Sequence, residues 1–193
     1  MDTPTFILDK VAPVFNKQGY VGTSLSAITK ATGLTKGAIY CNFANKEDLA
    51  LKAFELNIRT AIHPLFKIIA HTEGNLNKLY AITNYQRNYY HLVKDMGGCP
   101  MLRVGVDTKY INPLLFQAAA SLSLQMLKGL AKIIKDGISS QEFKPNIDAE
   151  EYAKAMLAMI EGSSLLAFTH NDESYISNAM NFIEHTIIEQ IKN

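Results

Sequence analysis

The sequence is poor in the features that mark several classes of protein. Its only two cysteines, Cys41 and Cys99, lie far apart and without neighbouring ligand residues, which predicts neither a disulfide framework nor a structural zinc site. Its uninterrupted apolar runs are a few residues long, whereas a membrane span needs about twenty. The first residues show no basic stretch and no apolar core of a secretory signal. We therefore expect a soluble, cytoplasmic protein with no membrane partner.

Charge of one sign is also missing, because 19 basic residues stand against 18 acidic ones. This balance argues against uniform polyanion binding, but it allows a compact basic face. With 193 residues and 48% hydrophobic content, the chain is long and apolar enough to bury a core. It has no nucleophile elbow, no glycine-rich phosphate loop and no histidine pair with metal-ligand spacing. We expect no enzyme activity, no metal and no cofactor.

Helical periodicity runs through almost every segment, and strand alternation is scarce. The pattern predicts an all-α fold of about nine helices, with a three-helix head over residues 1–45 and a helical body over 46–193. Thr3 is the expected N-cap of the first helix and Gly19 its end, and Pro13 predicts either a kink or a later start. The expected helices cover residues 3–17, 25–32, 36–42, 46–70 with a disturbance at 63–64, 75–95, 100–109, 113–139, 149–170 and 173–192.

The segment around Gly33 carries the most information about function. Leu25 and Ile28 share an apolar face of a short helix, Gly33 is placed to end that helix in a left-handed conformation, and Thr35 can cap the next helix. A helix, a tight glycine turn and a second short helix form the helix-turn-helix pattern, whose second helix enters the DNA major groove. The alternative is two ordinary packing helices of a bundle.

Residues on the outward side of this segment suit a duplex. Those of the second helix are hydrogen-bonding, cationic or small, and others lie at helix N-termini, which favour phosphate. Residues 1–60 hold seven basic and five acidic side chains, so the salt dependence of DNA binding should be shallow. The predicted DNA contacts are Thr23, Ser24, Thr35, Lys36, Gly37, Ala38, Tyr40, Asn42 and Lys46.

These residues carry a resemblance to a known family. The run from Phe15 to Leu49, with Gly19-Tyr20, Gly33-Leu34, Lys36-Gly37 and Ile39-Tyr40 at matching spacing, resembles the DNA-binding segment of the TetR family of bacterial transcriptional regulators. The resemblance implies a repressor that binds a palindromic operator in double-stranded DNA as a homodimer. It also implies a body pocket for an unknown small-molecule effector. The alternative is a helical small-molecule-binding protein whose DNA binding is weakened or lost.

Two further sets of residues are expected in the body. Aromatic, methionine and polar side chains are candidates for the ligand pocket; the alternative is ordinary core packing for the apolar ones and a solvated face for Asn84, Arg87 and Tyr89. The candidates are Phe66, Asn84, Arg87, Tyr89, Met101, Phe116 and Met126. Both cysteines are expected to be packing residues, with a redox role as the alternative.

The last two expected helices have the residue pattern of a protein–protein interface. Small residues on one helix and an isoleucine-rich stripe on the next predict the dimer contact that the resemblance implies. Burial of the stripe within the protomer is the alternative. The predicted interface residues are Ala155, Gly162, Ile176, Met180, Ile183 and Ile187.

Overall fold

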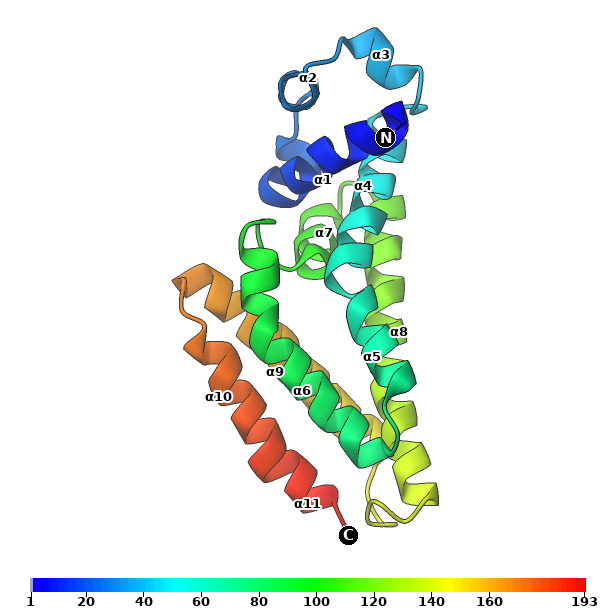
Figure 1. Ribbon diagram of the computed structural model, residues 1–193, viewed down its shortest axis with the longest axis vertical. Helices are drawn as coiled ribbons and strands as arrows, with labels where there is room; N and C mark the ends of the chain where they lie inside the picture. The colour runs from blue at the N-terminus through cyan, green and yellow to red at the C-terminus, as the bar shows by residue number, and fades with distance from the viewer. Residues whose placement is uncertain (1) are drawn as a thin grey trace. The chain divides into compact units, whose positions relative to one another are not determined.

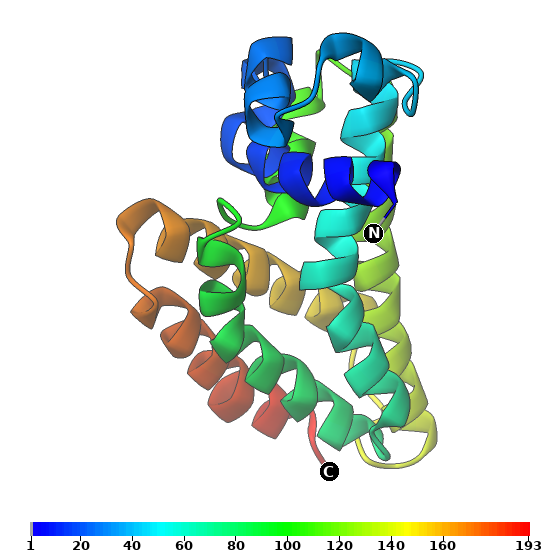
Figure 2. The ribbon, with the colours of Figure 1, turned by 45° about the horizontal axis from the view of Figure 1, so that its top comes forward.

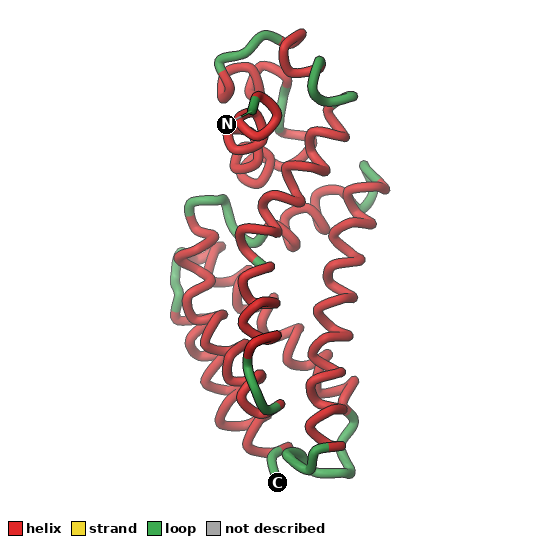
Figure 3. Tube along the Cα trace, turned by 45° about the vertical axis from the view of Figure 1, so that its right-hand side comes forward, coloured by secondary structure: helices red, strands yellow, loops and turns green. Residues whose placement is uncertain are grey.

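The structure, a computed structural model, describes residues 2–193. Within this range the regular elements are helices, apart from one isolated bridge between Phe143 and Lys192 (Figures 1 and 3), which confirms the all-α prediction. The chain forms two compact units. The N-terminal unit contains residues 2–62 and 95–121, and the C-terminal unit contains residues 63–94 and 122–193.

The N-terminal unit is larger than a three-helix head. It contains α1 (Thr3–Gly22), α2 (Leu25–Thr32), α3 (Lys36–Tyr40), α4 (Lys46–Ala61), α7 (Pro100–Thr108) and the start of α8 (Pro113–Ser139). Figure 2 shows α1 crossing α4, and α1 packs on α7 as well. Short helices bury too little surface to stand alone, so α4 and α7 complete the core. The functional division at residue 45 stays a prediction.

The first helix differs from the prediction at both ends. Asp2, rather than Thr3, is its N-cap, because the Asp2 carboxylate accepts the Thr5 amide at 3.0 Å. Pro13 lies inside the helix, which excludes a later start. Gly19, the expected end of the helix, leaves the helical conformation with a φ of 75°, but the helix continues to Gly22. A β-carbon at Gly19 would lie 2.6 Å from Asp107 Oδ2, the same atom that accepts the Tyr20 amide. The positive φ and this steric overlap both require glycine at position 19.

A loop over residues 96–99 is fixed to α1 within this unit. The buried Asn16 amide donates to the Met96 and Gly98 carbonyls, each at 2.8 Å. Between them, Gly97 has a φ of 97°, and a β-carbon there would lie 2.9 Å from the Lys17 Cα. Arg103 adds a hydrogen bond to the Lys17 carbonyl at 3.1 Å. The Gly-Gly stretch therefore lets the loop approach the α1 backbone closely.

The C-terminal unit contains α5 (His63–His71), α6 (Asn75–Lys94), the rest of α8, α9 (Ala149–His170), α10 (Ser174–Phe182), the π-helical η1 (Ile183–Ile188) and α11 (Glu189–Ile191). In it, α6 packs on α5, α9, α10 and η1. The break after Ala61 confirms the expected disturbance at residues 63–64. Asn112 and Asp148 cap the N-termini of α8 and α9, and the π-helical turn of η1 was not predicted.

The N-terminus of α6 is capped by a residue remote in sequence. Glu142, in the loop after α8, accepts the backbone amides of Asn75 at 3.0 Å and Leu76 at 2.9 Å. These bonds, which favour the charged carboxylate, lower the pKa of Glu142 to about 2. The contact holds the α6 start against the end of α8 inside the C-terminal unit.

Among the helices of residues 2–193, α8 alone is long and apolar enough, by length and composition only, to cross a membrane. About 33% of its most apolar stretch is buried inside the protein. Helix α8 supplies core side chains to both units, among them Leu115 and Ile134.

Candidate nucleic-acid interface and cavity

The turn between α2 and α3 has the predicted geometry. Ser24 caps α2 by accepting the Ala27 amide at 3.1 Å, and Thr35 caps α3 by accepting the Ala38 amide at 3.2 Å. Between these caps, Gly33 has φ 70° and ψ 8°, the left-handed conformation expected for it. Helix, turn and short second helix are visible in Figure 1 as α2 and α3.

The short helix α3 has one buried and one open side. Ile39 is fully buried, and it anchors α3 to a core that also contains Ile28 of α2. On the open side Lys36 and Gly37 are exposed and Tyr40 is half-buried. A β-carbon at Gly37 would meet only the Thr35 hydroxyl, at 4.0 Å, so the backbone on this side is accessible to another molecule. Ser24 and Thr35 are exposed beside it, and Ala38 is partly exposed.

Three predicted contact residues have other roles in the structure. Thr23 is fully buried and its hydroxyl donates to the Gly19 carbonyl at 2.6 Å, so its prediction as a surface contact is wrong. The Asn42 amide donates to the Ala38 carbonyl at 2.9 Å and so closes the end of α3. Lys46 Nζ lies 4.6 Å from the centre of the Tyr20 ring, and partial burial lowers the pKa of Lys46 although nearby Asp107 opposes the shift.

A cavity of about 330 Å³ lies within the C-terminal unit, between α5, α6, α8 and α9. Its walls are mainly apolar, with a few polar side chains. Predicted residues Phe66 and Met126 line it. The lining is completed by Leu65, Ile69, Ala70, Lys78, Ile82, Gln86, Gln125, Gly129, Leu130, Lys132, Ile133, Asp136, Leu157 and Ile160.

The other five predicted ligand residues do not line this cavity. Arg87 instead makes a two-pronged ion pair with Glu184, with both N–O distances 2.7 Å. Asn84 lies beside this pair and accepts from Arg87 at 3.3 Å. Tyr89, Met101 and Phe116 face other surroundings, the first two as buried side chains. Gln86, which does line the cavity, was missed; its signal was a polar residue at four-residue spacing from Ile82.

The isoleucine-rich stripe is buried inside its own protomer. Ile176, Met180, Ile183 and Ile187 are at most 7% exposed, so the alternative holds and their prediction as interface residues is wrong. They pack in the C-terminal unit, where α10 and η1 contact α6 and α10 contacts α9.

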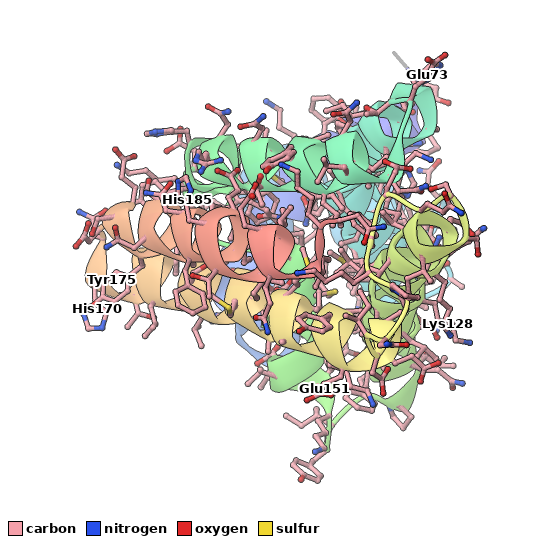
Figure 4. All side chains as sticks on the ribbon, turned by 90° about the horizontal axis from the view of Figure 1, so that it is seen from below. Glu73, Lys128, Glu151, His170, Tyr175 and His185 are labelled. Carbon is pink, nitrogen blue, oxygen red and sulfur yellow. The ribbon has the colours of Figure 1, made fainter. Side chains whose placement is uncertain are left out.

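Other side chains of α9 and α10 are exposed to solvent. Ala155 is exposed, and a β-carbon at Gly162 would meet no atom within 4 Å. Figure 4 shows His170 and Tyr175 together at the junction of α9 and α10, where their rings stack at 5.3 Å. We call this surface the α9–α10 face; its members are the half-buried Gly162 and the exposed Ala155, Ala158, Leu165, Leu166, Phe168, Tyr175 and Phe182.

The two cysteines differ in exposure. Cys41 is exposed at the end of α3, and Cys99 is buried at the start of α7. Among residues 2–193 there is no group of three or more histidine, cysteine, aspartate or glutamate side chains positioned for a metal ion.

A glycine turn that presents a short, capped helix with an exposed lysine, in a chain with an all-helical body, defines a helix-turn-helix protein. Residues 7–53 match the model for bacterial regulatory proteins of the tetR family. Residues 75–183, more than half of the chain, match the tetracyclin repressor-like C-terminal domain. The chain belongs to the TetR family, and it is a transcriptional regulator with an N-terminal DNA-binding domain rather than an enzyme.

Individual relatives agree over nearly the whole chain. A TetR-family regulator from Cytophaga hutchinsonii has a crystal structure with a TM-score of 0.88 and 33% identity, covering 98% of this chain and 94% of the other. The uncharacterized HTH-type regulator YxaF of Bacillus subtilis is 23% identical over 90% of this chain and 88% of its own length. The regulator CifR, at 16% identity, shares the fold with a TM-score of 0.78 over 92% of this chain and 94% of its own.

Proposed function

We propose that the protein is a ligand-responsive repressor that binds a palindromic operator as a homodimer in the cytoplasm. The observation that carries the proposal is the position of α3 after the left-handed Gly33, with Ile39 buried and Lys36 exposed. This arrangement exposes the polar side of α3 as a major-groove reader requires. The structure of CifR, a neighbour in fold, is a complex with 26-base-pair operator DNA, which supports DNA as the partner.

Base reading is assigned to Lys36 and backbone contacts to its surroundings. Lys36 is the first residue of α3, and Gly37 beside it leaves room for a base edge or sugar. A lysine at this place reads guanine acceptors in the major groove. Ser24, Thr35 and Tyr40 offer hydroxyl groups to phosphates, and Lys46 offers a charge from the start of α4.

The chain itself connects the cavity to the DNA-binding unit. Helix α6 contributes Ile82 and Gln86 to the cavity and continues into the loop that Asn16 holds on α1. Helix α8 contributes Met126 to the cavity, while its start belongs to the N-terminal unit. An effector that binds more tightly to the form unable to engage the operator shifts the population toward that form.

The α9–α10 face supplies the dimer contact in this proposal. Gly162 and Ala155 permit close approach of a second backbone, and Leu165 and Phe182 offer exposed apolar surface at 52% and 51% exposure. Exposed apolar surface of this kind marks an interaction site. An isologous two-fold contact between two such faces gives the dimer that a palindromic site requires.

Substitutions at the interface test the assignment of roles. On an operator selected from random duplexes, Lys36→Ala is expected to lower affinity by about tenfold and to relax base preference, because one base contact is worth about 1–3 kcal/mol. Lys46→Ala and Tyr40→Phe should weaken binding to specific and scrambled duplexes alike. Fluorescence anisotropy titrations with both duplexes measure this. Equal losses on both duplexes for all three variants would contradict the base-reading role of Lys36.

The low charge of the head favours a second candidate, a small-molecule-binding protein that no longer binds DNA. Residues 1–60 carry a net charge of only +2. The same titration with wild-type protein and random duplex at low salt separates the two. A DNA-binding protein shows association that falls with added salt, whereas the second candidate shows none.

A further inference from the structure

The cavity contains a buried acceptor whose hydrogen-bond partner is missing. Gln86 is 3% exposed, it lines the cavity, and its Oε1 atom accepts no hydrogen bond from any described residue. Buried polar atoms in folded proteins nearly always form hydrogen bonds, and a buried acceptor without one lowers the stability of the fold. Oε1 itself is shielded from solvent, so the Gln86 side chain must turn toward the cavity for this acceptor to receive a donor from a bound molecule.

The rest of the lining defines the body of that molecule. Apart from five polar side chains the walls consist of aliphatic residues, Phe66, Met126 and Gly129. The cavity volume of about 330 Å³ is at the lower end of the range for small-molecule sites. The ligand is therefore a small and mainly apolar molecule.

The charged side chains of the lining further restrict the chemical class of the ligand. Lys78, Ile82 and Gln86 follow one another at four-residue intervals on α6, so Lys78 and Gln86 stand about 12 Å apart along the helix. The other two charged side chains of the lining, Lys132 and Asp136, pair with each other at 2.7 Å. Lys78 thus leaves the lining with a net positive charge, which disfavours a cationic ligand.

We propose that the cavity binds a mainly apolar compound without positive charge, with a hydroxyl or N–H group that donates to Gln86 Oε1. This inference rests on the proposed function, because it identifies the chemical class of the effector. Phenols and alcohols of small size belong to the class, and hydrocarbons of the same shape do not.

Two nearly isosteric probes, 4-butylphenol and 4-butyltoluene, test the inference. Isothermal titration calorimetry on the full chain gives the ratio of their affinities for the wild type and for two variants. Gln86→Leu removes the acceptor. Gln125→Leu makes the same change at an exposed position of the same lining, and is the matched control. Circular dichroism establishes that both variants are folded.

In Gln86→Leu, the ratio of the affinity for 4-butylphenol to the affinity for 4-butyltoluene is expected to fall about tenfold, because one hydrogen bond to a buried acceptor is lost. In Gln125→Leu it should stay within about twofold of the wild type. An unchanged ratio in Gln86→Leu overturns the inference, and so does a failure of both probes to bind the wild-type protein. Operator binding, measured separately by anisotropy without any probe, decides the proposed function, so the two can fail independently.

Discussion

Leu165→Glu is expected to leave the protein monomeric in solution, because it places one charge from each protomer in the proposed two-fold contact. Leu165 belongs to the α9–α10 face and is 52% exposed in the protomer, so the substitution does not disturb the protomer's own core. In a two-fold contact the introduced glutamates lie close to each other, and their desolvation is not compensated. Operator affinity should fall by about a hundredfold, since each monomer then binds only one half-site.

The matched control is Leu124→Glu. Leu124 is an equally exposed leucine, at 50%, on α8 in the C-terminal unit and outside the α9–α10 face. Size-exclusion chromatography with light scattering should find Leu124→Glu dimeric like the wild type and Leu165→Glu at the mass of one chain. A dimeric Leu165→Glu protein, or two equally monomeric variants, would contradict the assignment of the α9–α10 face.

Gly97→Ala is expected to destabilise the N-terminal unit by about 3 kcal/mol, from backbone strain and steric overlap. At a φ of 97° a side chain is strained whatever the space around it. Here the added β-carbon would also lie 2.9 Å from the Lys17 Cα, a backbone atom that cannot give way alone. The loop would then move from α1, and both hydrogen bonds from the Asn16 amide would lengthen.

The same chemical change at Gly129 has the opposite expected sign. Gly129 lies inside α8, and a β-carbon there would meet no atom within 4 Å. Gly129→Ala should therefore stabilise the protein by about 0.5–1 kcal/mol, because alanine favours the helix. Urea unfolding followed by circular dichroism measures both variants. A Gly97→Ala protein as stable as Gly129→Ala would mean that the loop over residues 96–99 is not held as described.

Local signals in the sequence were sufficient for the turn and for most helix ends. Gly33 ends α2 in the left-handed conformation, and Thr35 caps α3 by accepting an amide three residues along the chain, so both can be recognised without knowledge of the fold. The family resemblance rested on the same short segment. This is why the fold class and the helix-turn-helix were predicted correctly.

Residues whose role depends on distant neighbours were not predictable in the same way. The stripe that contains Ile176 and Ile183 has the periodicity of an apolar helix face, but periodicity does not tell whether α6 and α9 or a second protomer covers that face. Arg87 was predicted as a ligand-binding residue from its residue type alone. Only the fold brings Glu184 beside it as an ion-pair partner. Glu142 caps α6 from a different part of the chain, and nothing in the sequence near Asn75 indicates this.

The central claim is that α3 reads DNA in a two-fold assembly. The most direct test is to select duplexes from a random library with the wild-type protein and to sequence them. The account predicts enrichment of a palindromic sequence whose half-sites are centred about one helical turn, or a small multiple of it, apart. Enrichment of a motif without two-fold symmetry, or no enrichment over the input library, would contradict it.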